Sequence, residues 1–315
     1  MSNFSTGVAI IGGGITGAAA AYRLSELGIV ADVHEAEALV GGRMARCEVA
    51  GALFDHGAQF FTTRGDKFRS LVQTAETEGA TQVWTRGFGD NPDGYERWRG
   101  VPDMTALTAW LLDKSQARLH LGSAIRDLGE LSASGIILTP PVPVSLSLAQ
   151  SSGMEPPSTI KTQLQAVQYK RTIAVLLVLE SSPKGMPVGG GIQLLDDTDL
   201  AFITDNNEKG VSPIPSLTIH LSNEASLDLW DEPDETVIGF ANDKLSRWVE
   251  AADVTTASIT RWRYAGPVDV IPESSVTWGH KPPLVVAGEA FNGPKVEGAF
   301  NSGIAAANQI AELVR

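Results

Sequence analysis

The stretch "GVAIIGGGITGAAAAYRL", Gly7–Leu24, constrains the fold of this chain more than any other. A short apolar strand over Val8–Ile11 runs into three glycines, and a helix rich in small residues follows from Ile15 to Leu27. The glycines of the G-x-G-x-x-G pattern are Gly12, Gly14 and Gly17. The first allows a tight turn, the second lets a pyrophosphate approach the backbone, and the third lets the helix pack closely on the strand. The helix start at Ile15 and Thr16 then offers free N–H groups to phosphates.

A carboxylate in the next element strengthens the dinucleotide interpretation. Val30–His34 is predicted as a second strand, and it ends at Glu35 and Ala36. A carboxylate at this point can accept hydrogen bonds from both ribose hydroxyls and repels a 2′-phosphate. The pattern therefore favours NAD or FAD over NADP, and a purely structural glycine turn is the alternative.

Two further segments favour FAD. Gly41 and Gly42 let the chain pass over a cofactor, and Arg43 can reach a phosphate or ribityl oxygen, although a turn with a solvated charge explains the same residues. Near the C-terminus, "LVVAGEAFNGPKVEGAFNSGIAAANQI" reads as a buried strand that ends at Gly288 and Glu289. Ligands bind at this end of such strands, where the Glu289 carboxylate can bond a ribityl hydroxyl.

The last predicted helix starts at Val296 and Glu297. Gly298, Ser302 and Ala306 leave one face nearly bare, so the helix N-terminus can press against a ring system. Its positive end would stabilise the N1–C2=O anion of a reduced flavin. A close-packed terminal helix is the alternative, but it does not account for the Gly-Glu pair before it.

The order of predicted elements indicates an α/β fold. Both chain ends consist of strand–glycine–helix units, whereas the middle carries strands over 173–179, 201–204 and 216–221. Helices are predicted over 66–77, from 102, and over 243–252, and the Ser- and Pro-rich residues 144–160 read as a linker or a short helix. We expect a Rossmann-like FAD-binding domain of the glutathione-reductase type, with an inserted mixed or antiparallel sheet plus helices. The predicted boundaries are 1–78, 99–148 and 279–315 for the first domain, and 79–98 and 149–278 for the second.

Composition excludes several classes of function. A net charge of −13 over 315 residues argues against nucleic acid and anionic membranes as partners. Cys47 is the single cysteine, which excludes an internal disulfide and fits a reducing cytoplasm. No stretch is long and apolar enough for a membrane span. His34, His120 and His280 show no ligand spacing, so no metal site is predicted.

The glycine loop, Glu35, residues 41–43 and residues 284–307 together resemble the flavin-binding framework of the FAD-dependent amine oxidase superfamily. Within it, the chain resembles the renalase-like flavoproteins of the bacterial type. The blocks that carry this resemblance run in order along the chain: "FDHGAQFFTTR" (Phe54–Arg64), "ILTPPVPVSLSL" (Ile137–Leu148), "LQAVQYKRTIAVLLVLE" (Leu164–Glu180), "TDNNEK" (Thr204–Lys209), "SLTIHLS" (Ser216–Ser222) and "RWRYAGP" (Arg261–Pro267).

The resemblance implies non-covalent FAD and a dihydronicotinamide dinucleotide as substrate. Such proteins oxidise the misreduced 2- and 6-dihydro isomers of NAD(P)H to NAD(P)⁺, and O2 then reoxidises the flavin to give H2O2. A monomer or a weak homodimer is expected. The dihydropyridine nitrogen already conjugates with the ring, so the protein need only stack and orient the substrate.

The resemblance also implies site residues. The segment Gly57–Gln59 is expected beside the flavin, with Gln59 either bonding flavin or substrate or buried as a satisfied amide. Asn206 and His220 are expected on the flavin face, and Trp262 and Arg263 are expected to supply a stacking wall and a charge. A plain half-buried strand explains the last two almost as well.

Two other functions remain open. One is an FAD-dependent oxidase of a small amine, which should show aromatic side chains around Gln59. The other is a flavoprotein whose FAD is structural or regulatory, which should have side chains filling the space over the flavin.

Overall fold

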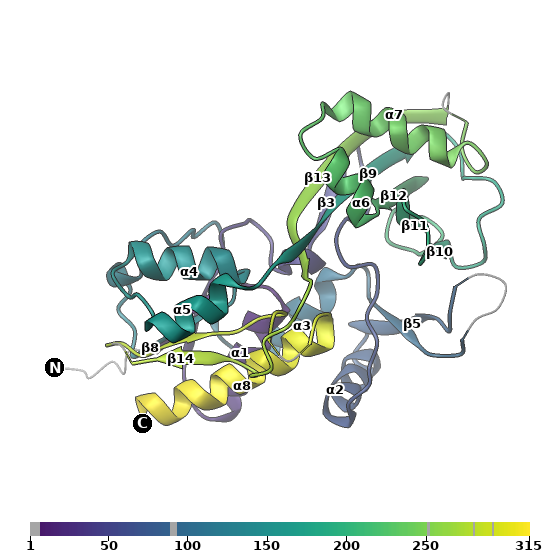
Figure 1. Cartoon of the computed structure of the whole chain (residues 1–315). Helices are drawn as coiled ribbons and strands as arrows, with labels where there is room; N and C mark the ends of the chain where they lie inside the picture. Colours follow the sequence, from purple (N-terminus) through teal and green to yellow (C-terminus); the bar gives the residue numbers. More distant parts are fainter. Residues whose placement is uncertain (1–6, 89–92, 251–252, 280, 292) are drawn as a thin grey trace.

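The computed structural model describes residues 7–88, 93–250, 253–279, 281–291 and 293–315, so His280 lies outside the described residues. The chain forms two lobes, each built around one sheet (Figure 1). The first sheet has the order β14-β15-β8-β1-β2-β7, and the second has the order β10-β11-β12-β9-β13. This arrangement confirms the predicted α/β architecture with a sheet-rich second part.

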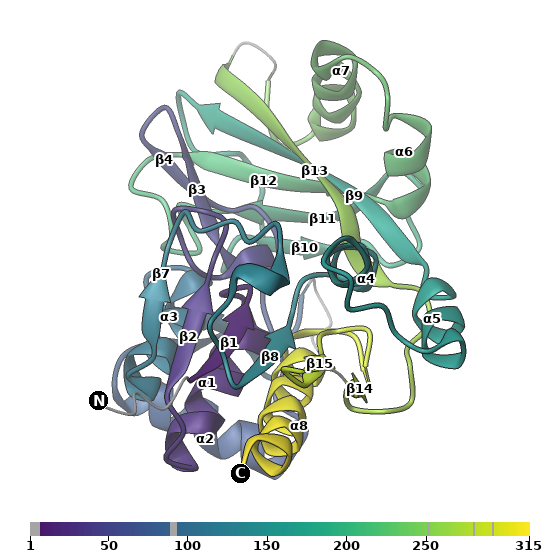
Figure 2. The same cartoon turned by 90° about the vertical axis from the view of Figure 1, so that its left-hand side faces the viewer.

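The six-stranded sheet draws on both ends of the chain (Figure 2). Its strands are β1 (Val8–Ile11), β2 (Ala31–His34), β7 (Arg118–His120), β8 (Gly135–Leu138), β14 (Val276–Trp278) and β15 (Leu284–Val286). Only the β14–β15 pair is antiparallel, and Ile10 of β1 faces both Val33 of β2 and Ile137 of β8 in parallel register. Because β8 also pairs with β15, the glycine loop and the C-terminal Gly-Glu segment leave the same edge of the sheet.

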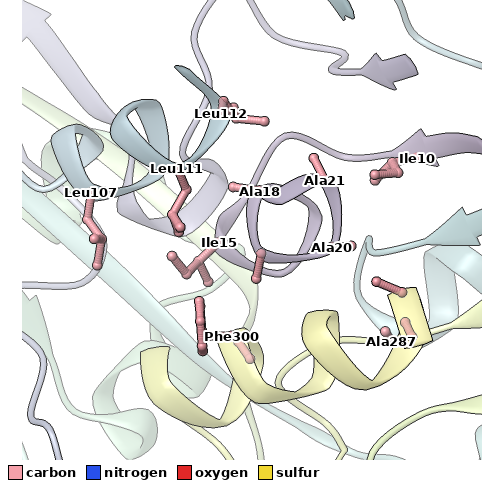
Figure 3. Packing of buried hydrophobic residues seen from close by; sticks show 14 of the residues in the cluster. Ile10, Ile15, Ala18, Ala20, Ala21, Leu107, Leu111, Leu112, Ala287 and Phe300 are labelled. Carbon is pink, nitrogen blue, oxygen red and sulfur yellow. The ribbon is translucent and has the colours of Figure 1, made fainter. Parts of the chain in front are cut away.

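Helices cover both faces of this sheet, because its strands β1 and β8 are apolar and buried along their whole length. On one face lie α1 (Ile15–Glu26), α2 (Asp66–Thr77), α3 (Thr105–Ser115) and α8 (Val296–Val314). Figure 3 shows Ile15 and Ala18 of α1 between the leucines of α3 and Phe300 of α8. The other face packs on α4 (Val142–Ser151) and α5 (Ser158–Gln165), through Leu138 and Leu146 among others.

Glycine sets the distance between α1 and α8. A Cβ atom on Gly303 of α8 would lie 2.2 Å from the carbonyl oxygen of Thr16, so no side chain fits at this crossing. The two helices therefore lie in backbone contact, and the start of α1 and the start of α8 belong to one packed unit.

The second sheet is antiparallel throughout. Its strands are β9 (Tyr169–Leu179), β10 (Gly191–Gln193), β11 (Leu200–Asp205), β12 (Ser216–Leu221) and β13 (Val254–Pro267). One face is covered by α6 (Asn223–Asp228) and α7 (Asp234–Leu245), and the other by the hairpin β3 (Arg46–Val49) and β4 (Ala52–Asp55). The hairpin carries residues of the first lobe onto the second, with Phe54 packed against Leu176.

A separate hairpin of β5 (Thr81–Thr85) and β6 (Arg97–Gly100) lies beside the first lobe, and two 3-10 turns occur at η1 (Gly42–Met44) and η2 (Leu128–Glu130). Residues 144–160 lie in α4, a short loop and α5, so the helical alternative for this segment is correct. The helix predicted over 243–252 coincides with α7 only over 243–245, because α7 begins at Asp234 and ends at Leu245; residues 251 and 252 lie outside the described residues. In the described part of the chain, no helix combines the length and apolar character of a membrane span.

Candidate functional site

The glycine loop between β1 and α1 is folded so that side chains are excluded from it. Gly12 has a φ of +103°, and a Cβ atom there would lie 2.5 Å from Thr139 Oγ1. A Cβ on Gly17 would lie 2.0 Å from the carbonyl oxygen of Gly12. Gly14 is the residue before α1, and no side chain caps the helix. The first turn therefore presents its N–H groups without a competing side-chain acceptor, as a phosphate site requires.

Glu35 is fixed beside this loop. Its carboxylate is 7% exposed, with Oε2 accepting from the Gly13 N–H at 2.7 Å and Oε1 accepting from the Glu37 N–H at 2.9 Å. A carboxylate oxygen accepts more than one hydrogen bond, so both oxygens retain capacity for ribose hydroxyls. Ala36 follows directly, at the carboxyl end of β2.

Arg43 and Glu289, which come from opposite ends of the chain, form an ion pair. Arg43 lies in η1, and its guanidinium contacts Glu289 Oε2 at 2.5 Å and donates to the Tyr264 carbonyl at 2.9 Å. Glu289 Oε1 is buried and makes no hydrogen bond with any described residue. A buried carboxylate oxygen without a donor is costly, so this atom is available to accept from a hydroxyl or N–H of a ligand.

The Glu289 carboxylate and burial together shift the pKa values of Arg43 and Tyr169. Burial of the Arg43 guanidinium opposes its charge, but the Glu289 carboxylate keeps the pKa of Arg43 above its usual value. Burial, and then the charge of Glu289, raises the pKa of the Tyr169 phenol, so Tyr169 is neutral. The Tyr169 hydroxyl accepts from the Val142 N–H at 3.1 Å, and its ring packs edge-on against Tyr264 with the centroids 5.2 Å apart.

The start of α8 lies close to α2. Val296 is buried, whereas the Glu297 carboxylate accepts from the backbone N–H groups of Arg64 and Gly65 at 2.8 and 2.7 Å, directly before α2. The Gly288 N–H donates to Ser302 Oγ at 2.9 Å, which holds the end of the last strand against α8. Contact of Val296 and Glu297 with a cofactor stays a prediction.

The segment Asp55–Gln59 passes directly over Arg43. A Cβ on Gly57 would lie 2.1 Å from the Arg43 carbonyl oxygen, and the Ala58 N–H donates to that oxygen at 2.8 Å. The Gln59 side chain donates to the carbonyls of Asp55 and Gly57 and accepts from Thr204 Oγ1 at 2.7 Å. Gln59 is thus a buried amide satisfied by the protein, one of the two roles considered for it.

The other predicted site residues lie on the antiparallel sheet. Asn206 is fully buried, accepts from the Asp55 N–H at 3.4 Å and donates to Thr218 Oγ1 at 3.0 Å. His220 Nε2 and Trp262 Nε1 both donate to the His56 carbonyl, at 3.1 and 2.9 Å. Burial lowers the pKa of His220 to about 4. The structure therefore brings together Gln59, Asn206, His220 and Trp262 around the Asp55–Gln59 segment.

The structure places Arg263 and Lys209 where the sequence does not suggest them. Arg263 is exposed and forms no ion pair with a described residue. Lys209, which the sequence analysis did not single out, is fully buried: its Nζ lies 2.7 Å from Asp55 Oδ2 and 2.6 Å from the Gln59 carbonyl. A lysine that follows the polar residues "TDNNE" is expected at the surface. Its buried position becomes evident only from its partner Asp55, which is far away in the sequence.

No group of three or more His, Cys, Asp or Glu side chains within the described ranges could hold a metal ion. A cavity of about 390 Å³ lies outside the site, at the β2–β7 edge beside His34 and His120. A smaller one, of about 160 Å³, lies beside α6 and α7.

Comparison with known proteins supports the fold of the first lobe. Residues 10–75 match the family of NAD(P)-binding Rossmann-like domains. Protoporphyrinogen oxidase 2, chloroplastic/mitochondrial, from Arabidopsis thaliana is 37% identical over 65 residues. That match covers 21% of this chain and only 13% of the oxidase.

Solved structures extend the similarity to the whole chain. A protein assigned as a protoporphyrinogen oxidase, from Exiguobacterium sp. 255-15, has a TM-score of 0.67 at 15% identity, covering 100% of this chain and 99% of that one. Wild-type putrescine oxidase bound to putrescine (TM-score 0.68) and cyclohexylamine oxidase from Brevibacterium oxydans (0.66) are each 15% identical and cover 98% of this chain and 99% of theirs. The fold of this chain is therefore the one found in these oxidases.

Proposed function

We propose that this protein is an oxidoreductase that binds FAD non-covalently and oxidises the 2- and 6-dihydro isomers of NAD(P)H to NAD(P)⁺. One observation carries the FAD part of the proposal. The buried Glu289 Oε1 atom has no donor within the described residues, and it lies where Arg43 and the C-terminal strand meet. A ribityl hydroxyl would supply the missing donor.

The residues present fit FAD along its length. The glycine loop and the uncapped start of α1 would hold the pyrophosphate, and the anchored Glu35 carboxylate would hold the adenosine ribose. Arg43 and Glu289 would hold the ribityl chain, and Gly57 and Ala58 would lie against it. The start of α8 would face the ring system.

The proposed substrate demands little acid–base chemistry from the protein. Bound FAD would accept a hydride, and O2 would take the electrons from it to give H2O2. The protein's part is to stack and orient the substrate ring. Gln59 and Asn206 have their hydrogen bonds satisfied, and His220 is neutral with Nε2 committed to a carbonyl. A reaction that needs no side-chain base to remove a proton suits this set of residues.

A small amine is the second candidate substrate. The favouring observation is the edge-on pair of Tyr169 and Tyr264 beside Arg43, because aromatic walls accommodate amines. The amine oxidase alternative predicts aromatic side chains around Gln59, whereas this pair lies beside Arg43.

Anaerobic reduction of the bound flavin separates these functions. Purified protein loaded with FAD would be mixed with borohydride-treated NAD⁺, which contains the isomers, with 4-NADH, or with putrescine and cyclohexylamine. We expect rapid bleaching of the visible flavin band with the isomer mixture alone. Bleaching by amines would replace the proposal with the amine oxidase, and bleaching by none would leave a structural or regulatory FAD.

A further inference from the structure

Lys209 occupies an unusual position for a lysine, at the boundary between the two lobes. It follows β11 in a tight turn, and its side chain and that of Asp55 are both 0% exposed. Its ammonium contacts Asp55 Oδ2 at 2.7 Å, the Gln59 carbonyl at 2.6 Å and the ring of Trp84, with the centroid at 4.6 Å. The ammonium thus makes two hydrogen bonds and one cation–π contact.

Asp55 extends this contact to two further elements, α3 and β12, and makes a second bond to the turn that holds Lys209. Its Oδ1 accepts from the Met104 N–H at 2.9 Å, at the start of α3. Its carbonyl accepts from Thr218 Oγ1 on β12 at 3.1 Å, and its N–H donates to Asn206. The ion pair therefore joins β4, α3, β11 and β12 at one point.

The same pair determines the path of the Asp55–Gln59 segment. Lys209 contacts both ends of it, through the Asp55 carboxylate and the Gln59 carbonyl. Between those ends, Gly57 and Ala58 press on the Arg43 backbone, and Arg43 pairs with Glu289. A shift of the segment would move the Arg43 backbone with it.

We propose that Lys209 is a positioning residue, which with Asp55 holds the Asp55–Gln59 segment and the Arg43 backbone in the geometry that accepts the cofactor. The statement about the segment stands on contacts within the protein, and the statement about the cofactor rests on the proposed function. Lys209 acts through this segment, because its two hydrogen bonds go to the Asp55 carboxylate and the Gln59 carbonyl.

The test must separate positioning from stability. Removing one partner of a buried ion pair leaves an uncompensated charge and destabilises the fold strongly, whereas replacing both partners by neutral residues is often tolerated. The informative protein is therefore the double variant Asp55→Asn/Lys209→Met, which keeps the shapes and removes both charges. Lys244→Met, which breaks the exposed Lys244–Asp199 pair, is the matched control.

Two measurements on these proteins decide the proposal. The first is hydrogen exchange at Ala58, whose N–H bonds the Arg43 carbonyl, and we expect the double variant to exchange at least about tenfold faster than wild type. The second is the dissociation constant of FAD, expected to rise about tenfold or more, because one misplaced hydrogen bond to a charged group is worth that factor. Lys244→Met should leave both unchanged.

A folded double variant with wild-type exchange at Ala58 and wild-type FAD affinity would overturn the proposal. If wild type itself takes up no FAD, the proposed function fails, while the exchange measurement still decides whether Lys209 holds the segment. Faster exchange with unchanged FAD affinity would overturn the cofactor part alone.

Discussion

At the scale of single residues, Gly17 shows how backbone contact limits the sequence. A Cβ atom at this position would meet the Gly12 carbonyl oxygen at 2.0 Å, so even alanine must push α1 away from the loop. We expect Gly17→Ala to lower the free energy of unfolding by about 1–3 kcal/mol and to weaken FAD binding.

A second glycine provides the control for this prediction. Gly239 lies in α7 with open space around the Cβ position, so Gly239→Ala should raise stability by about 0.5–1 kcal/mol. Both values can be measured by urea denaturation. Equal effects of the two substitutions would contradict the close contact at Gly17.

His220 makes stability depend on pH. Its pKa is about 4 in the folded protein because burial disfavours the charged form, against 6.5 for an unperturbed histidine. The unfolded chain therefore binds a proton that the folded protein does not, and folding stability falls as the pH drops from 6.5 towards 4. Because one pH unit is worth about 1.4 kcal/mol, the loss from this residue approaches about 3 kcal/mol.

The difference between wild type and His220→Gln isolates this contribution, since the other titrating groups are common to both proteins. Urea denaturation at a series of pH values should show wild type losing its advantage between 6.5 and 4. A difference that is constant over this range would show that His220 is not buried as a neutral group.

Residue partners were the least predictable part of the site. The positions of the glycines and of Glu35 in the fold could be predicted, because they follow from a local pattern of strand, turn and helix. The Arg43–Glu289 and Lys209–Asp55 pairs could not, since each joins residues that are far apart in the sequence. A charged side chain reads as solvated until its partner is known.

At the scale of elements, apolar runs predicted the central strands and the terminal helices well. β1, β12, α2 and α8 have the predicted bounds. The helix near residue 240 was misplaced because the prediction took no account of the signals at Pro233, Asp234 and Glu235. Pro before the first helical residue and acids in its first turn are start signals, and α7 begins there. Strands as short as β7 and β10 show no alternating hydrophobic pattern in the sequence. Their formation depends on pairing with the neighbouring strands of the sheet.

The crossing of α1 and α8 yields a prediction for these two helices. In Gly303→Val, the new side chain would collide with the Thr16 carbonyl, since a Cβ alone would lie 2.2 Å from it. We expect a loss of about 1–3 kcal/mol in stability and weaker FAD binding, because the starts of both helices separate. Leu313→Ala, on the same helix but 50% exposed, should change FAD binding little. Isothermal titration with FAD measures the affinity of the two variants. Equal affinities would show that the close contact of α1 and α8 at Gly303 does not affect FAD binding.

At the scale of the whole molecule, FAD should tie the two chain ends together. A ligand present at a hundred times its dissociation constant stabilises the protein that binds it by about 2.7 kcal/mol. We expect FAD to raise the melting temperature and to slow hydrogen exchange at the start of α1 and after β15 at once. In Glu289→Gln, which removes the carboxylate charge that pairs with Arg43 and changes the buried oxygen that lacks a donor, the same FAD concentration should give a smaller shift. Protection confined to the α1 end would be evidence against a site shared by both termini.

The strand order β15-β8-β1 has a consequence for how this protein is made. β1 and α1 are synthesised well before β15 and α8, two of the elements that bury them. Until β15 and α8 have emerged, the apolar surface of β1 and α1 is only partly covered, which exposes it to wrong contacts. Completion of α8, rather than emergence of the glycine loop, is therefore the earliest moment at which the proposed nucleotide site can form.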